Sequence, residues 1–279
     1  MKDPEDSSIA VVGAARDVAD FLPKLVEVFD ASFRGFKKVC FFIVENNSID
    51  TTKKVLIQLQ KEKANFHVYN LPDSTGKIKY KTERIAIARN LAIDEVKRVY
   101  PNVDYVAVVD LDAINLGLTR EAVESCWKYK NWNALFANQP DGYYDIYALR
   151  HRIWSPRDFL LDYESLKNEF NEKIALELSL NSKRIKIKKT SNLIKIDSAF
   201  GGLGIYRAND LFKEIYIGLD SAGNPLCEHL SVNLGIVEKG GNLYINPEMT
   251  NTLSYKRLNK IKAFLHDKYA QNNNSMVVQ

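Results

Sequence analysis

The sequence predicts an α/β fold built on a parallel sheet with helices on both faces. In its first half, apolar runs of strand length alternate with amphipathic stretches of helical period. Alternation of this kind is typical of βαβ units, whose parallel strands need cover on both sides. The chain has 279 residues, of which 46% are hydrophobic and 27% are charged, so it can bury a sizeable core.

Four buried strands are predicted in the first half, at residues 8–15, 37–46, 65–71 and 103–110. A helix is expected after each of the first three. Asp17 is placed to cap the first helix. The apolar stripe of that helix comprises Val18, Phe21, Leu22, Leu25, Val26 and Phe29. The second helix is expected to begin at Ser48 or Asp50, and the third covers residues 82–100.

The second half is less regular. An aromatic-rich section at 127–154 is followed by a charged helix near 161–180 and by a return to strand character at 197–207. A further helix is predicted over 229–239. The tail around residues 271–275 (QNNNS) is expected to fray.

Composition and charge exclude several classes of protein. The net charge of +4 is small and the basic residues are mostly scattered, so no nucleic-acid partner is expected. Cys40, Cys126 and Cys227 have no paired spacing, which predicts neither a disulfide framework nor a zinc site and favours a reducing compartment. Neither a leader pattern nor an apolar run long enough for a membrane span is found. We therefore expect a cytoplasmic protein.

Basic residues gather in one segment, residues 181–190 (NSKRIKIKKT). The segment carries Lys183, Arg184, Lys186, Lys188 and Lys189. One interpretation is a solvated loop or edge strand kept soluble by its lysines. The other is a contact for anionic lipid or for a phosphate-bearing acceptor, which would place the protein at the periphery of a membrane.

Polar residues at the ends of the predicted strands indicate where a ligand binds. In open α/β sheets, ligands bind outside the carboxyl ends of the strands. The segments that meet at this edge are residues 14–16, residues 45–47, the loop after Leu71 and residues 110–112.

Two carboxylates, Asp110 and Asp112, directly follow the strand at 103–110. In a turn just past the strand end, both can face one ion. Mg²⁺ and Mn²⁺ prefer oxygen ligands and take only one or two from protein, the rest coming from water and substrate phosphates. The pair therefore predicts a divalent cation with a nucleoside diphosphate. The alternative is that Asp110 caps the next turn and Asp112 is a solvated loop residue.

Several segments of the first half resemble the nucleotide-sugar half of GT-A-fold glycosyltransferases. They are the opening strand, VENNSID at 44–50, the helix that carries IARN at 87–90, and VDYVAVVDLD at 103–112. The ordered set is much more specific than the two aspartates alone.

Three later segments resemble the fungal capsule-associated mannosyltransferase family and similar bacterial and viral capsule or lipopolysaccharide transferases. They are YYDIYALRH at 143–151, IKIDSAFGGLGIYR at 194–207 and CEHLSVNLGIVEKGGNLYINPEM at 227–249. The fungal family has Ser-Glu-Cys where this chain has Cys-Glu-His at 227–229, so Glu228 is the shared residue. The likeness covers about residues 8–250.

The resemblance implies a single GT-A-like (Rossmann-like) domain with a mixed, mostly parallel central sheet flanked by helices. Residues 8–115 would be its nucleotide-sugar-binding half and residues 116–253 its acceptor-binding half, followed by a C-terminal helix and frayed tail at 254–279. The implied function is metal-dependent transfer of a hexose or deoxyhexose from a nucleotide-diphosphate sugar to a glycan or lipid-linked acceptor in surface polysaccharide synthesis.

Site residues also follow from the resemblance. Asp112 would bind Mn²⁺ or Mg²⁺ directly, Asp110 would approach the ribose or the metal, and His229 is a further candidate ligand, although a lone histidine is more often a packing residue. The donor-binding set comprises Ala15, Arg16, Glu45, Asn47, Arg84, Arg89, Asp110, Leu111 and Asp112. Glu45 could instead cap the next helix.

Glu228 would be the catalytic base that removes the proton of the acceptor hydroxyl. Its alternative role is to favour the dipole of the helix that follows. The acceptor-binding set comprises Asp145, Arg150, His151, Phe200, Gly201 and Gly202. The tyrosines of YYDIYALRH at 143–151 would equally suit an aromatic core.

Two other functions stay open. A nucleotidyltransferase acting on a sugar phosphate also uses carboxylates at a strand end, but it normally has a glycine-rich phosphate loop, and VVGAARD at 11–17 has one glycine. A non-catalytic sugar-binding module of the same fold would need neither Glu228 nor the two aspartates.

Overall fold

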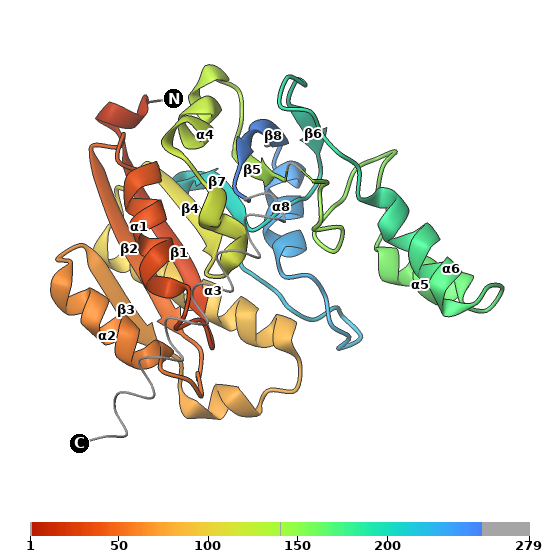
Figure 1. The fold of residues 1–279 in the computed structure, drawn as a ribbon, viewed down its shortest axis with the longest axis horizontal. Coiled ribbons are helices and arrows are strands. Elements are labelled where there is room, and N and C mark those ends of the chain that lie inside the picture. Colours follow the sequence, from red (N-terminus) through yellow and green to blue (C-terminus); the bar gives the residue numbers. More distant parts are fainter. Residues whose placement is uncertain (1, 140, 253–279) are drawn as a thin grey trace, which may run out of the picture.

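The chain forms a single α/β domain around one eight-stranded sheet (Figure 1). The computed structural model describes residues 2–139 and 141–252. The strands are β1 (Ser8–Ala15), β2 (Lys38–Glu45), β3 (Phe66–Asn70), β4 (Tyr105–Asp110), β5 (Ala134–Asn138), β6 (Ile194–Ile196), β7 (Leu203–Arg207) and β8 (Leu243–Thr250). Their order in the sheet is β3-β2-β1-β4-β7-β5-β8-β6.

The sheet is mixed but mostly parallel, as predicted. β1 pairs in parallel with β2 and β4, β2 with β3, and β5 with β8. β7 runs antiparallel between β4 and β5, and β6 runs antiparallel to β8 at the edge. The predicted halves at 8–115 and 116–253 therefore share one sheet, and β4 and β7 are the strands that join them.

Helices cover both faces of the sheet (Figure 1). They are α1 (Leu22–Ser32), α2 (Thr52–Glu62), α3 (Lys81–Val99), α4 (Arg120–Glu124), α5 (Phe159–Leu166), α6 (Glu172–Ser179), α7 (Ala208–Leu211) and α8 (His229–Glu238). Alternate residues of β1 point to opposite faces. Ala10 and Val12 join a core layer with α3 and α8, whereas Ile9 and Val11 join a second layer with α1 and α2.

The four predicted strands of the first half are confirmed, and so are its long helix and the helix after Glu228. The predicted cap of the first helix is wrong. α1 begins at Leu22, and Asp17 adopts a left-handed conformation with φ of 53°. Its Oδ1 accepts from the backbone N–H of Ile49 at 2.8 Å, because the loops after β1 and β2 bind each other.

Two other predictions need correction or lie outside the description. The charged helix near 161–180 is two short helices, because Asn171 caps α6 by accepting from the N–H of Ile174 at 3.0 Å. The predicted C-terminal helix and tail at 254–279 lie outside the described residues. No helix within residues 2–139 or 141–252 is long and apolar enough to cross a membrane.

Candidate active site

A cavity of about 730 Å³ opens at the carboxyl ends of β1 and β4, where the sequence predicts ligand binding. The first half contributes the two strand ends and residues of α3. The second half contributes Tyr144, Asp145, Tyr147, Phe200 and residues 227–229. The predicted site residues that line it are Arg16, Arg84, Arg89, Asp110, Leu111, Asp112, Asp145, Phe200, Glu228 and His229.

Arg89, on α3, joins the carboxylates of the two halves. Its side chain is 6% exposed. Nη2 donates to Oδ1 of Asp110 at 2.9 Å, and Nη1 donates to Oε1 of Glu228. A buried carboxylate is stable only with a partner, and here one guanidinium donates to both carboxylates, the buried Glu228 and the partly exposed Asp110. Arg89 therefore explains how a strand as buried as β4 can end in an aspartate.

The charges of this group influence one another. Burial opposes the charged form of Arg89, but Glu228 and Asp110 raise its pKa above the ordinary value. Burial raises the pKa of Asp110 to about 7, while Arg89 acts in the opposite direction. Arg89 therefore stays charged throughout the physiological range, and Asp110 is the member whose charge changes near neutrality.

The neighbouring Asn90 and Thr82 bind α3 to the second half. Asn90 Nδ2 donates to the carbonyl of Tyr216 and its Oδ1 accepts from the Tyr216 N–H, both at 2.9 Å. Thr82 Oγ1 donates to the carbonyl of Gly218 at 2.7 Å. Arg89 and Asn90 therefore connect α3 to residues 216–229, while Arg89 also lines the cavity, and its predicted contact with the donor stays a prediction.

His229 packs beneath the cavity. Its Nε2 contacts Nη1 of Arg89, and since an arginine N–H can only donate, Nε2 is the acceptor and the proton is on Nδ1. Burial, with a further contribution from Arg89, holds the pKa of His229 well below its ordinary range. The ring stacks on Phe200 with centroids 3.7 Å apart. A metal ion at Nε2 would have to displace Arg89, so this nitrogen fits the packing alternative, and the ligand role of His229 stays a prediction.

Asp112 is the exposed carboxylate of the site. Its Oδ1 accepts from the N–H of Ile114 at 2.9 Å and caps the 3₁₀ turn Ala113–Gly117. The other oxygen has no partner within the described residues. Asp112 therefore has an oxygen to offer to a bound cation while its backbone position is fixed.

Asp145, Gly201 and Gly202, three of the predicted acceptor residues, form one unit of the second half. Asp145 Oδ2 accepts from the N–H of Gly201 at 3.0 Å, and burial raises the pKa of Asp145. Gly201 and Gly202 have φ of 66° and 82°, which side chains other than glycine rarely adopt. A Cβ on Gly201 would lie 2.8 Å from the carbonyl oxygen of Ala137. The glycines shape the backbone behind Phe200 and do not line the cavity themselves.

Buried amides hold this turn in place. Asn251 Nδ2 donates to the carbonyl of Gly201, and Asn115 Nδ2 donates to the carbonyls of Gly202 and Asp110, each at 2.8 Å. Asn251 Nδ2 also lies 2.8 Å from Oδ1 of Asn115. Both amides are fully buried, so the end of β4 and the acceptor-side turn are fixed by one network.

Three predicted donor residues lie beside the cavity. Ala15 is fully buried in β1. Glu45 accepts from the N–H of Ser48 at 2.6 Å, in the loop before α2, and it does not cap that helix, whose N-cap is Thr51. Asn47 has φ of 53° and donates to Oγ1 of Thr75 at 2.7 Å. Glu45 and Asn47 line an adjacent hollow of about 540 Å³ at the ends of β2 and β3.

Arg150 and His151 lie outside the cavity. Arg150 Nη2 pairs with Asp158 at 2.8 Å. Nδ1 of His151 accepts from the N–H groups of Ile153 and Trp154 at 3.1 and 2.9 Å. Both side chains hold the chain where it enters α5, so the structure does not place them with the other acceptor residues.

Some cavity residues were not among the sequence candidates. They include Lys81, Thr82, Tyr144, Tyr147 and Cys227. Tyr144 and Tyr147 flank Asp145, so the density of tyrosines around that aspartate was a usable signal. Lys81 and Thr82 are the first two residues of α3. The first turn of a long helix that packs on a sheet could have been considered as part of the ligand site.

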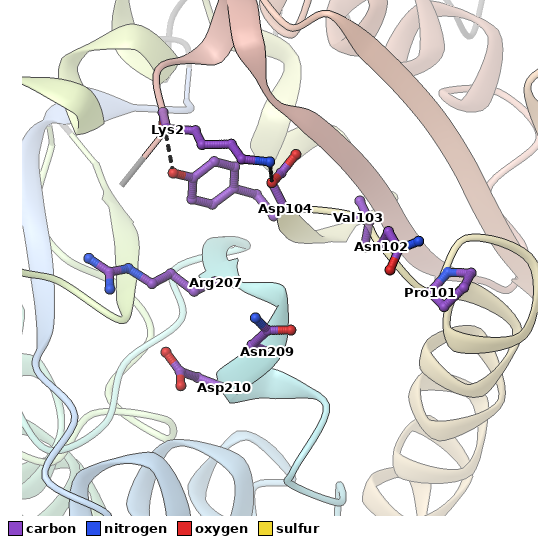
Figure 2. A pocket seen from close by; sticks show the side chains of 9 residues that line it. Lys2, Pro101, Asn102, Val103, Asp104, Arg207, Asn209 and Asp210 are labelled. Carbon is purple, nitrogen blue, oxygen red and sulfur yellow. Dashed lines mark hydrogen bonds and ion pairs between the residues drawn. The ribbon is translucent and has the colours of Figure 1, made fainter.

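A second cavity, of about 510 Å³, lies at the other end of β4 (Figure 2). Lys2 Nζ pairs with Asp104 at 2.7 Å, and Tyr105 donates to the carbonyl of Lys2 (Figure 2). Asp210 accepts from Asn133 at 2.6 Å. Lys2, Asp104 and Asp210 therefore already have partners, and this cavity lies at the amino end of β4. We assign the ligand-binding site to the first cavity, which lies at the carboxyl ends of the strands.

Comparison with known proteins supports the fold. No family model and no curated protein matches the chain. Among solved structures, the chain is similar to TarS of S. aureus, with a TM-score of 0.50 and 12% identity over 92% of this chain and 39% of that one. The mannosyltransferase PcManGT from Pyrobaculum calidifontis, in complex with GDP-Man and Mn²⁺, has a TM-score of 0.48 and 12% identity, over 91% of this chain and 59% of that one.

The chain thus spans less than two thirds of either structure. At this identity the likeness to TarS establishes the fold alone, and it confirms the predicted α/β class with a mixed, mostly parallel sheet. The finer resemblance to the fungal capsule-associated family stays a prediction, since no family model matches.

Proposed function

We propose that the chain is a metal-dependent glycosyltransferase that moves a sugar from a nucleotide-diphosphate sugar to a glycan or lipid-linked acceptor, in the synthesis of a surface polysaccharide. The observation that carries this proposal is the composition of the cavity. It brings the exposed Asp112 of the first half together with Glu228 of the second half, and both line the same space. A transferase needs a donor group and an acceptor group within one cavity.

The donor side has the charges that a nucleoside diphosphate requires. Arg16, Lys81 and Arg84 line the cavity and are available to bind phosphate oxygens. Asp110 and Asp112 each have one oxygen engaged in a contact, with Arg89 and with the N–H of Ile114 respectively. Their remaining oxygens suit a hard cation.

The residues present fit Mn²⁺ or Mg²⁺. Within the described part of the chain, no group of three or more His, Cys, Asp or Glu side chains could hold a metal ion by itself. Asp112 and Asp110 would supply one or two ligands, which is the number these cations commonly take from protein when a diphosphate supplies others. When bound, such a cation would offset the charge that develops on the leaving nucleoside diphosphate.

Glu228 is the proposed base. It is 7% exposed and lines the cavity. Oε1 faces Arg89 and lies 3.6 Å from His229, which leaves Oε2 as the oxygen that can accept a proton from an acceptor hydroxyl. Arg89 would then act as a positioning residue, because it fixes the base relative to the strand end that binds the donor.

The acceptor would enter between Asp145, Tyr144 and Tyr147. Asp145 is held by the N–H of Gly201, and the two tyrosines provide aromatic surface on either side of it. An aromatic face beside a carboxylate suits a sugar ring, which has apolar C–H faces and hydroxyl edges.

A product analysis tests the proposed function. The protein is incubated with Mn²⁺ and with UDP-, GDP- and dTDP-sugars, and released nucleotides are separated by chromatography. We expect slow release of a nucleoside diphosphate and free sugar in the absence of acceptor. In a parallel incubation with nucleoside triphosphates and sugar phosphates, release of pyrophosphate would instead indicate a nucleotidyltransferase. Binding of a nucleotide sugar without any turnover, with or without glycan acceptors, would indicate a binding module.

A further inference from the structure

α5 and α6 form a helical hairpin that projects from the body of the domain (Figure 1). Large apolar side chains are exposed along it and just after it. They are Leu160, Leu161, Phe170, Ile174, Leu176, Leu178 and Ile185, with exposed fractions between 41% and 61%. We call these residues the hairpin surface. On α6, Ile174 and Leu178 are one turn apart and lie on the same side.

The base of the hairpin is firmly attached to the domain. Asp158 pairs with Arg150 at 2.8 Å, and both side chains are more than four-fifths buried. Lys183 Nζ pairs with Asp162 at 2.6 Å, and the carbonyl of Lys183 accepts from Trp154 Nε1 at 2.7 Å. The hairpin surface is therefore presented in a fixed orientation by a folded element, and its exposure does not come from a loose chain end.

The segment that follows α6 is basic, whereas residues 157–180 carry three basic and six acidic residues. Residues 181–190 carry five basic residues and no acidic residue. Four of the five, Arg184, Lys186, Lys188 and Lys189, are exposed. Over the whole of residues 157–190 there are eight basic and six acidic residues, a net charge of +2. Two of the acidic residues, Asp158 and Asp162, already have basic partners.

We propose that the hairpin surface, together with the exposed basic residues of 181–190, binds the surface of an anionic membrane. Exposed leucine, isoleucine and phenylalanine side chains gain by entering the boundary between headgroups and acyl chains. Lysine and arginine beside them are attracted to anionic headgroups. The two features occur together in one projecting element, and charge complementarity selects a negatively charged surface as the partner.

The position of the hairpin suits an acceptor held in a membrane. Phe159, the first residue of α5, packs edge-on against Tyr147 with ring centroids 6.1 Å apart. Tyr147 lines the cavity close to Glu228. A membrane bound at the hairpin would thus lie on the acceptor side of the cavity. This last point rests on the proposed function, whereas membrane binding itself does not.

Vesicle sedimentation tests the proposal without donor or acceptor, so its result is independent of the proposed enzymatic activity. The full chain is mixed with vesicles of phosphatidylcholine alone or of phosphatidylcholine and phosphatidylglycerol in equal amounts. We expect binding to the anionic vesicles only, weakening as salt is added. K186Q/K188Q/K189Q should weaken it about a hundredfold, and L161N/I174N at least about tenfold.

Matched controls have the same substitutions elsewhere. K54Q/K61Q/K130Q removes three exposed lysines from other surfaces, and I57N removes an isoleucine that is 46% exposed on α2. Both should bind like the native chain. The proposal is overturned by failure of the native chain to bind anionic vesicles, or by equal losses in the control variants. It is also overturned if light scattering shows that the native chain is a dimer that L161N/I174N dissociates, because the hairpin surface would then be an interface between two copies.

Discussion

The two sides of the cavity are built in different ways. On the first side, the functional residues follow β1 and β4 directly, so their place is set by the regular alternation of strand and helix. On the second side, Asp145, Phe200 and Glu228 come from irregular segments far apart in the sequence, and buried polar contacts hold them together. The difference shows that one side of this site is a local consequence of the fold, whereas the other depends on long-range partners.

Arg89 is the side chain through which the two sides meet. Its side chain extends from α3 and pairs with Asp110 on one side and with Glu228 on the other. Its Cζ atom lies 4.8 Å from the centroid of the Phe200 ring. If the account is right, changes on the second side should abolish chemistry without affecting donor binding, and changes at Arg89 should affect both sides together.

The largest effect is expected for Glu228→Gln, which keeps the shape of the side chain and removes its basicity. Turnover should fall by roughly two to four orders of magnitude, the usual contribution of a general base. Donor affinity should barely change, because the proposed diphosphate contacts are on the other side. Steady-state kinetics and donor titration measure both. Transfer at a near-native rate, or a product with retained anomeric configuration, would contradict the assignment of Glu228 as the general base.

The next effect concerns Arg89→Met. Removing one partner of a buried ion pair leaves the carboxylates uncompensated, so we expect the free energy of unfolding to fall by about 3–5 kcal/mol. Combining it with Glu228→Gln should restore part of that loss, since the amide carries no charge. Urea unfolding measures both.

Arg98→Met is the matched control, because Arg98 pairs with Glu95 on the exposed face of the same helix. That pair should contribute about 0.2–1 kcal/mol. Losses of similar size in the two variants, or strict additivity of Arg89→Met and Glu228→Gln, would contradict the joining role of Arg89.

A smaller effect is expected for Asn251→Ala. The change leaves the carbonyl of Gly201 with one fewer donor and Oδ1 of Asn115 without this partner, at a cost of about 1–3 kcal/mol. Asn168→Ala, at an exposed amide on the hairpin, should change stability by less than about 0.5 kcal/mol. If Asn251→Ala is equally mild, the amide network does not hold the second side together.

The smallest effect is a pH dependence on the first side. The pKa of Asp110 is raised to about 7, mainly by burial, so below that pH the carboxyl keeps its proton and a cation has to displace it. Affinity for Mn²⁺ should therefore rise as the pH increases towards 7, by up to about tenfold per unit, and level off above it. Calorimetric titration of the native chain and of Asp110→Asn checks this. A flat profile in the native chain, or the same slope in the variant, would contradict it.

How well each side of the cavity could be predicted from sequence depends on whether its residues belong to regular elements or to irregular segments. The strands up to β4 and the carboxylates at 110 and 112 could be predicted, because buried strands leave a hydrophobic pattern and their ends converge at one edge. The partner of Asp110 could not, since nothing local to Arg89 distinguishes it from Arg84 five residues earlier. Helical spacing alone did not show that Arg89 turns into the core while Arg84 binds the carbonyl of Ile78.

The second side was predicted only through its resemblance to other proteins. Glu228 and the Phe200–Gly202 turn were identified in this way, but Arg150 and His151 were placed with them by sequence proximity to Asp145. Both side chains instead bind the segment that leads into α5: Arg150 pairs with Asp158, and His151 accepts from the N–H of Trp154. Asn115 and Asn251 carry no sequence signal, since a buried amide is defined only by what the fold brings to it.

The central claim is that the cavity binds a nucleotide-diphosphate sugar through a divalent cation at Asp112. Thermal unfolding of the native chain and of Asp112→Asn, with UDP-, GDP- and dTDP-sugars in the presence and absence of Mn²⁺, tests it most directly. A ligand that binds only the folded state raises Tm by mass action. We predict that one nucleotide class raises the Tm of the native chain only with Mn²⁺ and leaves that of Asp112→Asn unchanged. No response to any nucleotide sugar, or an equal response in the variant, would contradict the claim.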